Sequence, residues 1–108
     1  MQPELVERHY SNGQLRCQYI EVNEKIHGEC KLWYEHGQIR EVSYHSHGLF
    51  NGECKRWYAS GKLFSQLFYH DGVCKIDFLK QPHLCPKTEQ ERILFALKYS
   101  AAPLCLMG

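Results

Sequence analysis

Hydrophobic and aromatic residues gather in short runs that are separated by polar turns containing glycine. Four of these runs have the length and residue types of β-strands. They cover Glu29 to Tyr34, Ile39 to Tyr44, Glu53 to Tyr58 and Leu63 to Tyr69. Glycine adopts positive backbone φ angles without a steric penalty, so turns of this kind close tight hairpins. The pattern predicts a row of antiparallel hairpins.

The same pattern recurs every 24 residues along the chain. The segment Tyr10-Ser-Asn-Gly-Gln-Leu returns as Tyr34-Glu-His-Gly-Gln-Ile and again as Tyr58-Ala-Ser-Gly-Lys-Leu. A second motif, Gly-Glu-Cys30-Lys, returns at the same spacing as Gly-Glu-Cys54-Lys. Periods of roughly 20 to 50 residues are typical of supersecondary units that bury their apolar faces against one another. We therefore expect two strands per repeat, with Tyr10, Tyr34 and Tyr58 forming a ladder.

The repeats end before the chain does. The predicted units cover about residues 8–31, 32–55 and 56–79, and the outer ones are the least regular. Two prolines between Gln81 and Pro86 then exclude regular strand pairing, and Thr88 and Glu91 have the spacing of a helix capping box. We expect a mainly β protein, with an elongated antiparallel meander of hairpins over residues 1–80. A linker and a short C-terminal α-helix should follow over residues 81–108.

The predicted helix has one apolar side. Ile93, Leu94, Leu97 and Ala101 lie along it at helical spacing, and Pro103 should end the helix. This side has two alternative roles. It covers the exposed edge of the last strand, which would otherwise invite aggregation, or it faces a protein partner.

The strand pattern does not decide which face of the sheet is buried. Alternation along the strand places Cys30 and Leu32 on one face, with Lys31 and Trp33 on the other. In the next repeat Arg56 takes the place of Leu32. Neither face is cleanly apolar, and the assignment stays open at this point.

Charge and composition narrow the function classes. Thirteen Lys and Arg against twelve Asp and Glu leave a net charge of +1, so no strong field attracts nucleic acid or an anionic membrane. The N-terminus lacks the basic and apolar regions of a secretion signal, and no apolar stretch reaches the ~20 residues of a membrane-spanning helix. We expect a soluble, intracellular, cytoplasmic protein with reduced thiols and no nucleic-acid partner.

Seven histidines and six cysteines raise the question of a metal or catalytic site. The nearest arrangement is His70, Cys74, His83 and Cys85, whose spacing matches no common zinc signature. Most of the cysteines and histidines follow the repeat, whereas a nucleophile with its base would break the periodicity. We expect no metal, no cofactor and no enzyme activity, with a metal-stabilised domain as an alternative.

The two motifs together resemble a variant of the MORN repeat, whose name stands for membrane occupation and recognition nexus. The resemblance covers roughly residues 8 to 79. The residues that carry it are Tyr10, Gly13, Leu15, Gly28, Tyr34, Gly37, Ile39, Gly48, Gly52, Tyr58, Gly61, Leu63 and Gly72. It is nearest to the YwqK-type antitoxin-like branch, as found in bacteria and large DNA viruses of amoebae. The resemblance implies a sheet of hairpins that acts in protein association, with lipid binding proposed for some members and no catalytic residues.

These observations favour a non-catalytic protein-interaction or scaffold module, which either self-associates or joins a larger assembly such as a virus particle. The alternatives are a peripheral binder of anionic phospholipid and an antitoxin-like inhibitor of a partner protein. The expected binding residues are the repeat aromatics Tyr10, Trp33, Tyr34, Trp57 and Tyr58, and the partner-facing helix residues Ile93, Leu94 and Leu97. The expected partner is another protein or a second copy of the chain, and a virion is the alternative location.

Overall fold

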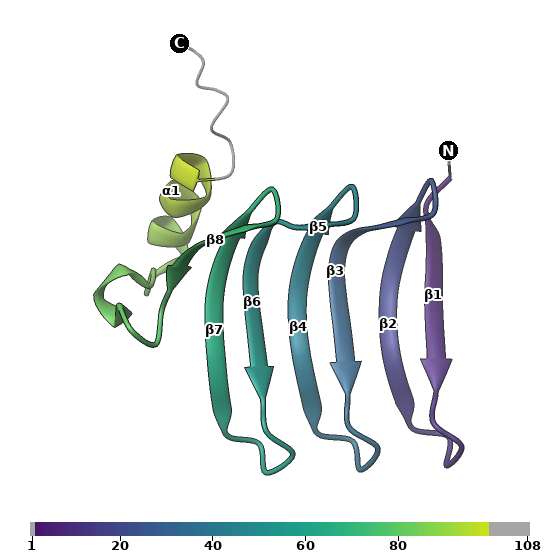
Figure 1. The fold of residues 1–108 in the computed structure, drawn as a ribbon. Coiled ribbons are helices and arrows are strands. Elements are labelled where there is room, and N and C mark those ends of the chain that lie inside the picture. The colour runs from purple at the N-terminus through teal and green to yellow at the C-terminus, as the bar shows by residue number, and fades with distance from the viewer. Residues whose placement is uncertain (1, 100–108) are drawn as a thin grey trace.

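A computed structural model describes residues 2–99 of the protein. Within these residues, one antiparallel sheet of eight strands is followed by one α-helix (Figure 1). The strands are β1 (Glu4–His9), β2 (Leu15–Val22), β3 (Lys25–Trp33), β4 (Ile39–Ser46), β5 (Leu49–Phe50), β6 (Gly52–Trp57), β7 (Leu63–His70) and β8 (Val73–Asp77). A 3-10 turn (Pro82–Leu84) leads to helix α1 (Glu89–Tyr99). The strand order β1-β2-β3-β4-β6-β7-β8 follows the chain, with β5 paired to β4, so the predicted meander is confirmed.

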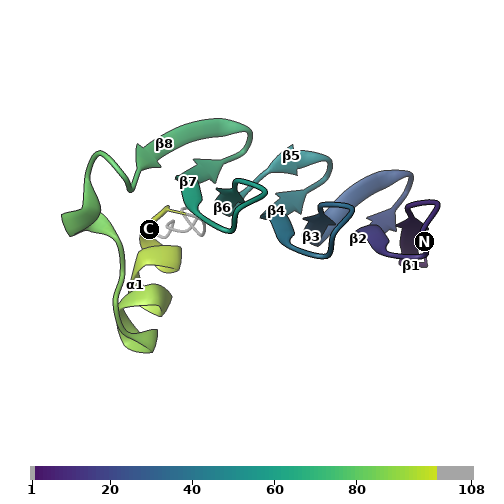
Figure 2. The same cartoon turned by 90° about the horizontal axis from the view of Figure 1, so that it is seen from below.

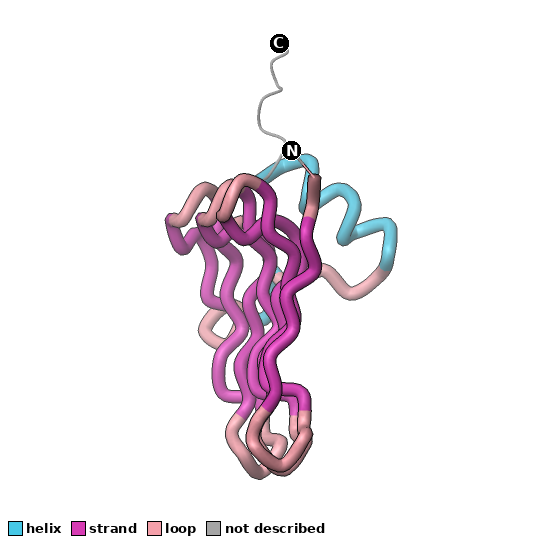
Figure 3. Tube along the Cα trace, turned by 90° about the vertical axis from the view of Figure 1, so that its right-hand side faces the viewer, coloured by secondary structure: helices cyan, strands magenta, loops and turns pink. Residues whose placement is uncertain are grey.

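Each hairpin is bent, so that its upper part folds over one face of the sheet. Figure 2 shows β5 and β8 on the side opposite α1, and Figure 3 shows the same bend from the end of the row. The upper turns bond to the preceding hairpin. The Gly48 N–H donates to the Ile26 carbonyl oxygen (3.0 Å), and the Gly72 N–H donates to the Phe50 carbonyl oxygen (2.8 Å). The bend therefore encloses one face of the sheet along the row.

The face under the bend is the closed face, and it settles the question that alternation left open. Cys30, Ser43 and Cys54 are buried there, with Cys30 directly opposite Ser43. Arg56 also lies on this face, opposite Glu41, and its Nε donates to a Glu41 carboxylate oxygen at 2.8 Å. An ion pair thus fills the position where the first full repeat carries a leucine.

The tyrosines at the lower turns form the predicted ladder. The Tyr10 hydroxyl donates to the Trp33 carbonyl oxygen (2.7 Å), and the Tyr34 hydroxyl donates to the Trp57 carbonyl oxygen (2.8 Å). Each bond joins one hairpin to the next. Tyr58 has no such acceptor among residues 2–99, because the chain turns away after β8, and it is 52% exposed. The ladder ends at this tyrosine.

Polar side chains lock the same turns together. The Asn12 side-chain N–H donates to a turn carbonyl of the next repeat (3.2 Å), and His36 Nε2 lies 2.9 Å from the equivalent carbonyl one repeat later. Gln38 packs over Gly61, where an added Cβ would lie 3.1 Å from the Gln38 side-chain oxygen. Since Gly61 also has a φ of +94°, both its backbone and its neighbour require glycine.

Helix α1 packs on the face opposite the bend, at the C-terminal end of the row. The Phe95 ring lies 4.7 Å from the Phe68 ring and 5.7 Å from the Phe78 ring, centroid to centroid. Phe68, Ile76 and Phe78 form the buried cluster beneath it. The apolar patch that holds the helix therefore lies on the face of the sheet, over β7 and β8. This cluster also joins residues on both sides of the predicted boundary at residue 80.

The start of the helix agrees with the predicted capping box. The Glu91 N–H donates to Thr88 Oγ1 (3.1 Å), while a Glu91 carboxylate oxygen accepts from the Lys87 N–H (2.8 Å). Ala101 and Pro103, which were expected to continue and end the helix, lie outside the described residues. The helix is therefore defined from its cap to Tyr99.

Candidate interaction surface

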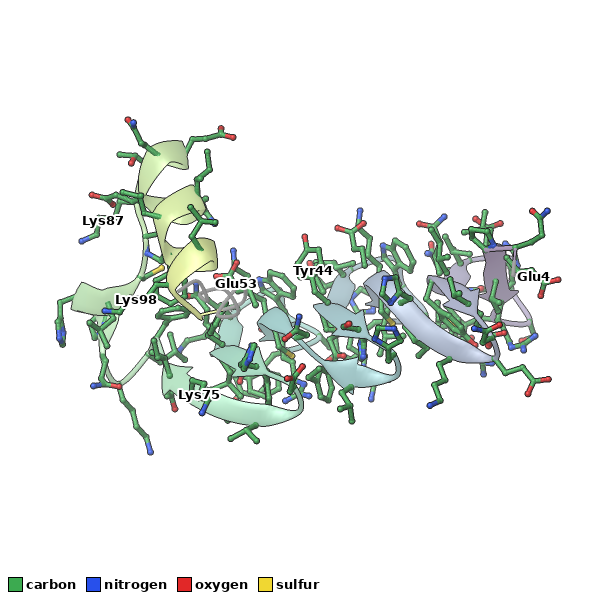
Figure 4. The ribbon with its side chains drawn as sticks, turned by 90° about the horizontal axis from the view of Figure 1, so that it is seen from above. Glu4, Tyr44, Glu53, Lys75, Lys87 and Lys98 are labelled. Atoms are coloured by element: carbon green, nitrogen blue, oxygen red, sulfur yellow. The ribbon has the colours of Figure 1, made fainter. Side chains whose placement is uncertain are left out.

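The face opposite the bend stays open where the helix does not cover it. We call this area the open-face surface. It comprises Lys31, Trp33, Val42, Tyr44, Lys55 and Trp57. The strand register brings these side chains together, because Lys31 lies opposite Val42 and Val42 lies opposite Lys55 on its other side. Figure 4 shows Tyr44 and Glu53 on the same side of the sheet as the helix, with Lys75 on the opposite side.

Two shallow hollows interrupt this side of the molecule. One of about 140 Å³ is lined by Val42, Tyr44, Glu53, Lys55 and Trp57. The other, of about 100 Å³, lies where helix and sheet meet and is lined by Glu53, Phe68, Phe78, Pro86, Arg92 and Phe95. Glu53 lines both hollows, so the two lie next to each other between the sheet surface and the base of the helix.

Two ion pairs balance part of the charge on this side. Lys31 lies 3.8 Å from the Glu29 carboxylate, which also accepts a hydrogen bond from the Tyr44 hydroxyl (3.2 Å). Burial, followed by the nearby Glu29 charge, raises the pKa of Tyr44 above its usual value. Glu53 pairs with Arg92 at 3.8 Å. The surface is therefore aromatic and nearly neutral, which does not favour a polyanionic ligand.

The five predicted binding aromatics separate into two groups. Trp33 and Trp57 are half-buried at the lower end of the open-face surface. Tyr10 and Tyr34 are also half-buried, and their hydroxyls serve the ladder between repeats. Tyr58 ends the ladder. The open-face surface thus contains the tryptophans but not the tyrosines of this prediction.

The three predicted helix residues point away from the sheet cluster. Ile93, Leu94 and Leu97 are 54%, 62% and 58% exposed, whereas Phe95 makes the contact with the sheet. An apolar helix side is therefore open to solvent beside the open-face surface, among the residues that the structure describes.

Sequence reasoning missed one polar pair on the closed face. Ser43 Oγ lies 3.0 Å from His45 Nε2, which is the arrangement of a nucleophile with its base. Burial lowers the pKa of His45, and the Phe50 ring lies 4.7 Å from the imidazole. Ser43 has no exposed surface, so no substrate reaches the hydroxyl. A serine and a histidine two residues apart in one strand carry no sequence signal for such a contact.

The cysteines and histidines show no metal centre in the part of the chain that the structure describes. Among residues 2–99, no three His, Cys, Asp or Glu side chains cluster in a way that could hold a metal ion. The described cysteines are free thiols, and burial raises the pKa of Cys30 and of Cys54 to about 11. A helix with the length and apolar character to span a bilayer is likewise absent from this part of the chain.

The hairpins between Ile26 and Asp71 repeat the same contacts, from the upper turn bonds to the tyrosine ladder. Residues 26–47 and 50–71 each match the MORN repeat variant. The first match covers most of β3 and β4, and the second covers β6 and β7. No curated protein and no solved structure matches the chain. MORN repeats generally mediate protein or membrane interactions. The open-face surface is the candidate for such an interaction in this chain.

Proposed function

We propose that this chain is a non-catalytic protein-interaction module, and that its open-face surface docks a segment of another protein. The observation that carries the proposal is the half-buried Trp57 beside a hollow lined by Val42, Tyr44 and Lys55. Aromatic side chains at the rim of a shallow hollow are typical of the residues that dominate binding energy at protein interfaces. The exposed helix side next to it extends the area available to a partner.

The proposal excludes catalysis by the buried thiols on chemical grounds. A thiol must ionise to act as a nucleophile, and a pKa of about 11 keeps Cys30 and Cys54 protonated near neutral pH. Both side chains are also buried on the closed face. We therefore propose no nucleophilic role for these two thiols.

The test is an affinity capture with the intact chain as bait, compared with two open-face variants. Trp57→Ala removes the aromatic anchor, and Lys55→Glu changes the charge beside it without emptying the core. Tyr58→Ala is the matched control, because Tyr58 is an exposed aromatic outside this surface. Circular dichroism of each variant first checks that the sheet is folded.

A protein partner that both open-face variants lose and the control keeps would support the proposal. Its identity would also separate the specific forms of the role, an antitoxin-like inhibitor or a component of a virus particle. A partner that all variants keep would exclude the open-face surface. Capture of no protein, with co-sedimentation on anionic phospholipid vesicles that Lys55→Glu abolishes, would favour the peripheral lipid binder instead.

A further inference from the structure

Strand β1 has an unpaired outer edge. It is the first strand of the sheet order and pairs with β2 alone, and Figure 1 shows no described segment beyond it. Its outward N–H and C=O groups are therefore available to another strand. Leu5 in this strand is 63% exposed. The opposite end differs, because β8 stops at Asp77 and the chain continues into the linker and helix.

Among residues 2–99, Glu4 and Arg8 of β1 have no partner of opposite sign. Glu4 lies opposite Glu21 of β2, and Arg8 lies opposite Cys17. Neither Glu4 nor Arg8 belongs to any ion pair within residues 2–99. Like charges directly opposite each other in a sheet are destabilising, so the chain by itself leaves Glu4 in an unfavourable position.

We propose that β1 pairs antiparallel with β1 of a second copy, around a twofold axis at Val6. Glu4 of each copy then lies opposite Arg8 of the other. The sheets of the two copies become one continuous sheet, and the association closes as a dimer because both copies use the same strand.

The charge pattern selects this register from the alternatives. Side chains opposite each other in a sheet lie on the same face. The twofold axis must therefore pass between one residue of β1 and the same residue of the second copy. An axis at Leu5 pairs only the first half of the strand. An axis at Glu7 or at Arg8 places that charged residue opposite itself, which is destabilising. The axis at Val6 alone pairs opposite charges.

The same register also joins apolar groups on the open face. Leu5 of one copy lies diagonally across from Leu5 of the other, within reach of side-chain contact. Ile20, which lies opposite Leu5 in the same chain and is 39% exposed, adds to this apolar strip. Directly opposite each Leu5 stands Glu7 of the second copy, so the two Leu5 side chains meet only along the diagonal.

This inference deepens the proposed interaction role by naming a second copy as one partner, and it rests on that role but not on the open-face surface. The test is sedimentation equilibrium of the full chain over a wide concentration range. Glu4→Arg and Arg8→Glu each place like charges opposite one another in the dimer. The double variant exchanges the charges and restores the opposite-sign pairs.

We expect the wild type to dimerise and each single variant to weaken the dimer roughly tenfold, since two symmetric pairs change sign. The double variant should recover wild-type affinity. Glu4→Arg removes the repulsion from Glu21, so its monomer stays folded and its loss of dimer reports on association alone.

The inference would be overturned by a wild type that stays monomeric at millimolar concentration, by single variants that dimerise as tightly as the wild type, or by no recovery in the double variant. The two proposals fail separately. A dimer that Glu4→Arg disrupts and Trp57→Ala leaves intact supports pairing through β1, whatever the capture experiment finds. A dimer lost in Trp57→Ala would place self-association on the open face and overturn the β1 assignment.

Discussion

The Tyr34 hydroxyl offers a direct test of how the repeats hold together. It donates to the Trp57 carbonyl oxygen of the next hairpin at 2.8 Å in a partly buried position. Tyr34→Phe removes this bond while keeping the ring, which is stacked on His36 at 5.7 Å and lies 5.5 Å from the Arg40 guanidinium. Only the link between two repeats is lost.

A net intramolecular hydrogen bond contributes about 1 kcal/mol to folding, and we expect Tyr34→Phe to lower the free energy of unfolding by that amount. In a domain of this size the melting temperature should fall by about 4–8 °C. Urea unfolding followed by tryptophan fluorescence measures the change, with an unchanged denaturant slope showing that the native fold persists.

Tyr58→Phe is the matched control, because its hydroxyl has no acceptor among residues 2–99. Its effect should stay within about 0.5 kcal/mol, as for surface changes in general. Tyr10→Phe should behave like Tyr34→Phe, since its bond is equivalent. Equal losses for Tyr34→Phe and Tyr58→Phe would refute the view that the ladder joins the repeats.

Three further predictions concern the buried thiols and the helix. Iodoacetamide at mildly alkaline pH should label exposed Cys74 and leave Cys30 and Cys54 unmodified, as seen by mass spectrometry, because burial protects both and raises their pKa to about 11. The folded chain holds these protons more tightly than the unfolded chain, so the thiol contribution to stability is complete below pH 9.0 and is lost as the pH rises to about 11. Urea titrations at several pH values should show that the free energy of unfolding falls less steeply over this range in a Cys30→Ala, Cys54→Ala variant. Phe95→Ala should lower the free energy of unfolding by about 2–3 kcal/mol through lost packing on the sheet cluster, whereas exposed Leu94→Ala should change it by less than about 0.5 kcal/mol; similar losses for both variants in urea unfolding would contradict the observed packing of the helix.

Much of the architecture could be predicted because it is periodic. The local features that predict it recur in each repeat: glycine turns, alternating strands and the spacing of Tyr10, Tyr34 and Tyr58. The hairpins, the meander and the ladder follow from them. A capping box is equally local, which explains why Thr88 marked the start of the helix correctly.

The bend of the hairpins could not be predicted from the same features. It accompanies irregularities in the strand pairing, between Tyr19 and Glu21, between Phe68 and Tyr69, and between β5 and β6, where the Asn51 N–H donates to the Tyr44 carbonyl oxygen (2.8 Å). Gly52 follows with a φ of +123°, and an added Cβ would lie 3.2 Å from the Tyr44 Cβ. Such a close approach between strands appears only once the strands are placed. The closed face depends on this bend, so strand alternation alone left it undecided.

The packing of the helix could not be predicted from the sequence, because its apolar residues lie on two sides. Ile93, Leu94 and Leu97 form the larger set and are exposed, while Phe95 packs against the sheet cluster. The orientation of the helix thus follows the Phe95 ring rather than the three aliphatic side chains, since this ring packs against the rings of Phe68 and Phe78. The open-face surface was only partly foreseen for a related reason: its hollow combines residues of β4 and β6 that only the register brings together.

Because the apolar core is unevenly distributed, the two ends of the row of repeats should differ in local stability. The buried cluster of Phe68, Ile76 and Phe78 anchors the C-terminal end, while β1 contains no fully buried side chain. Cooperative opening should therefore begin at β1 and progress along the row, and amide protons should exchange fastest there. Pairing through β1 would join the two chains at the ends that fray most readily, so that assembly and protection from local unfolding become the same event.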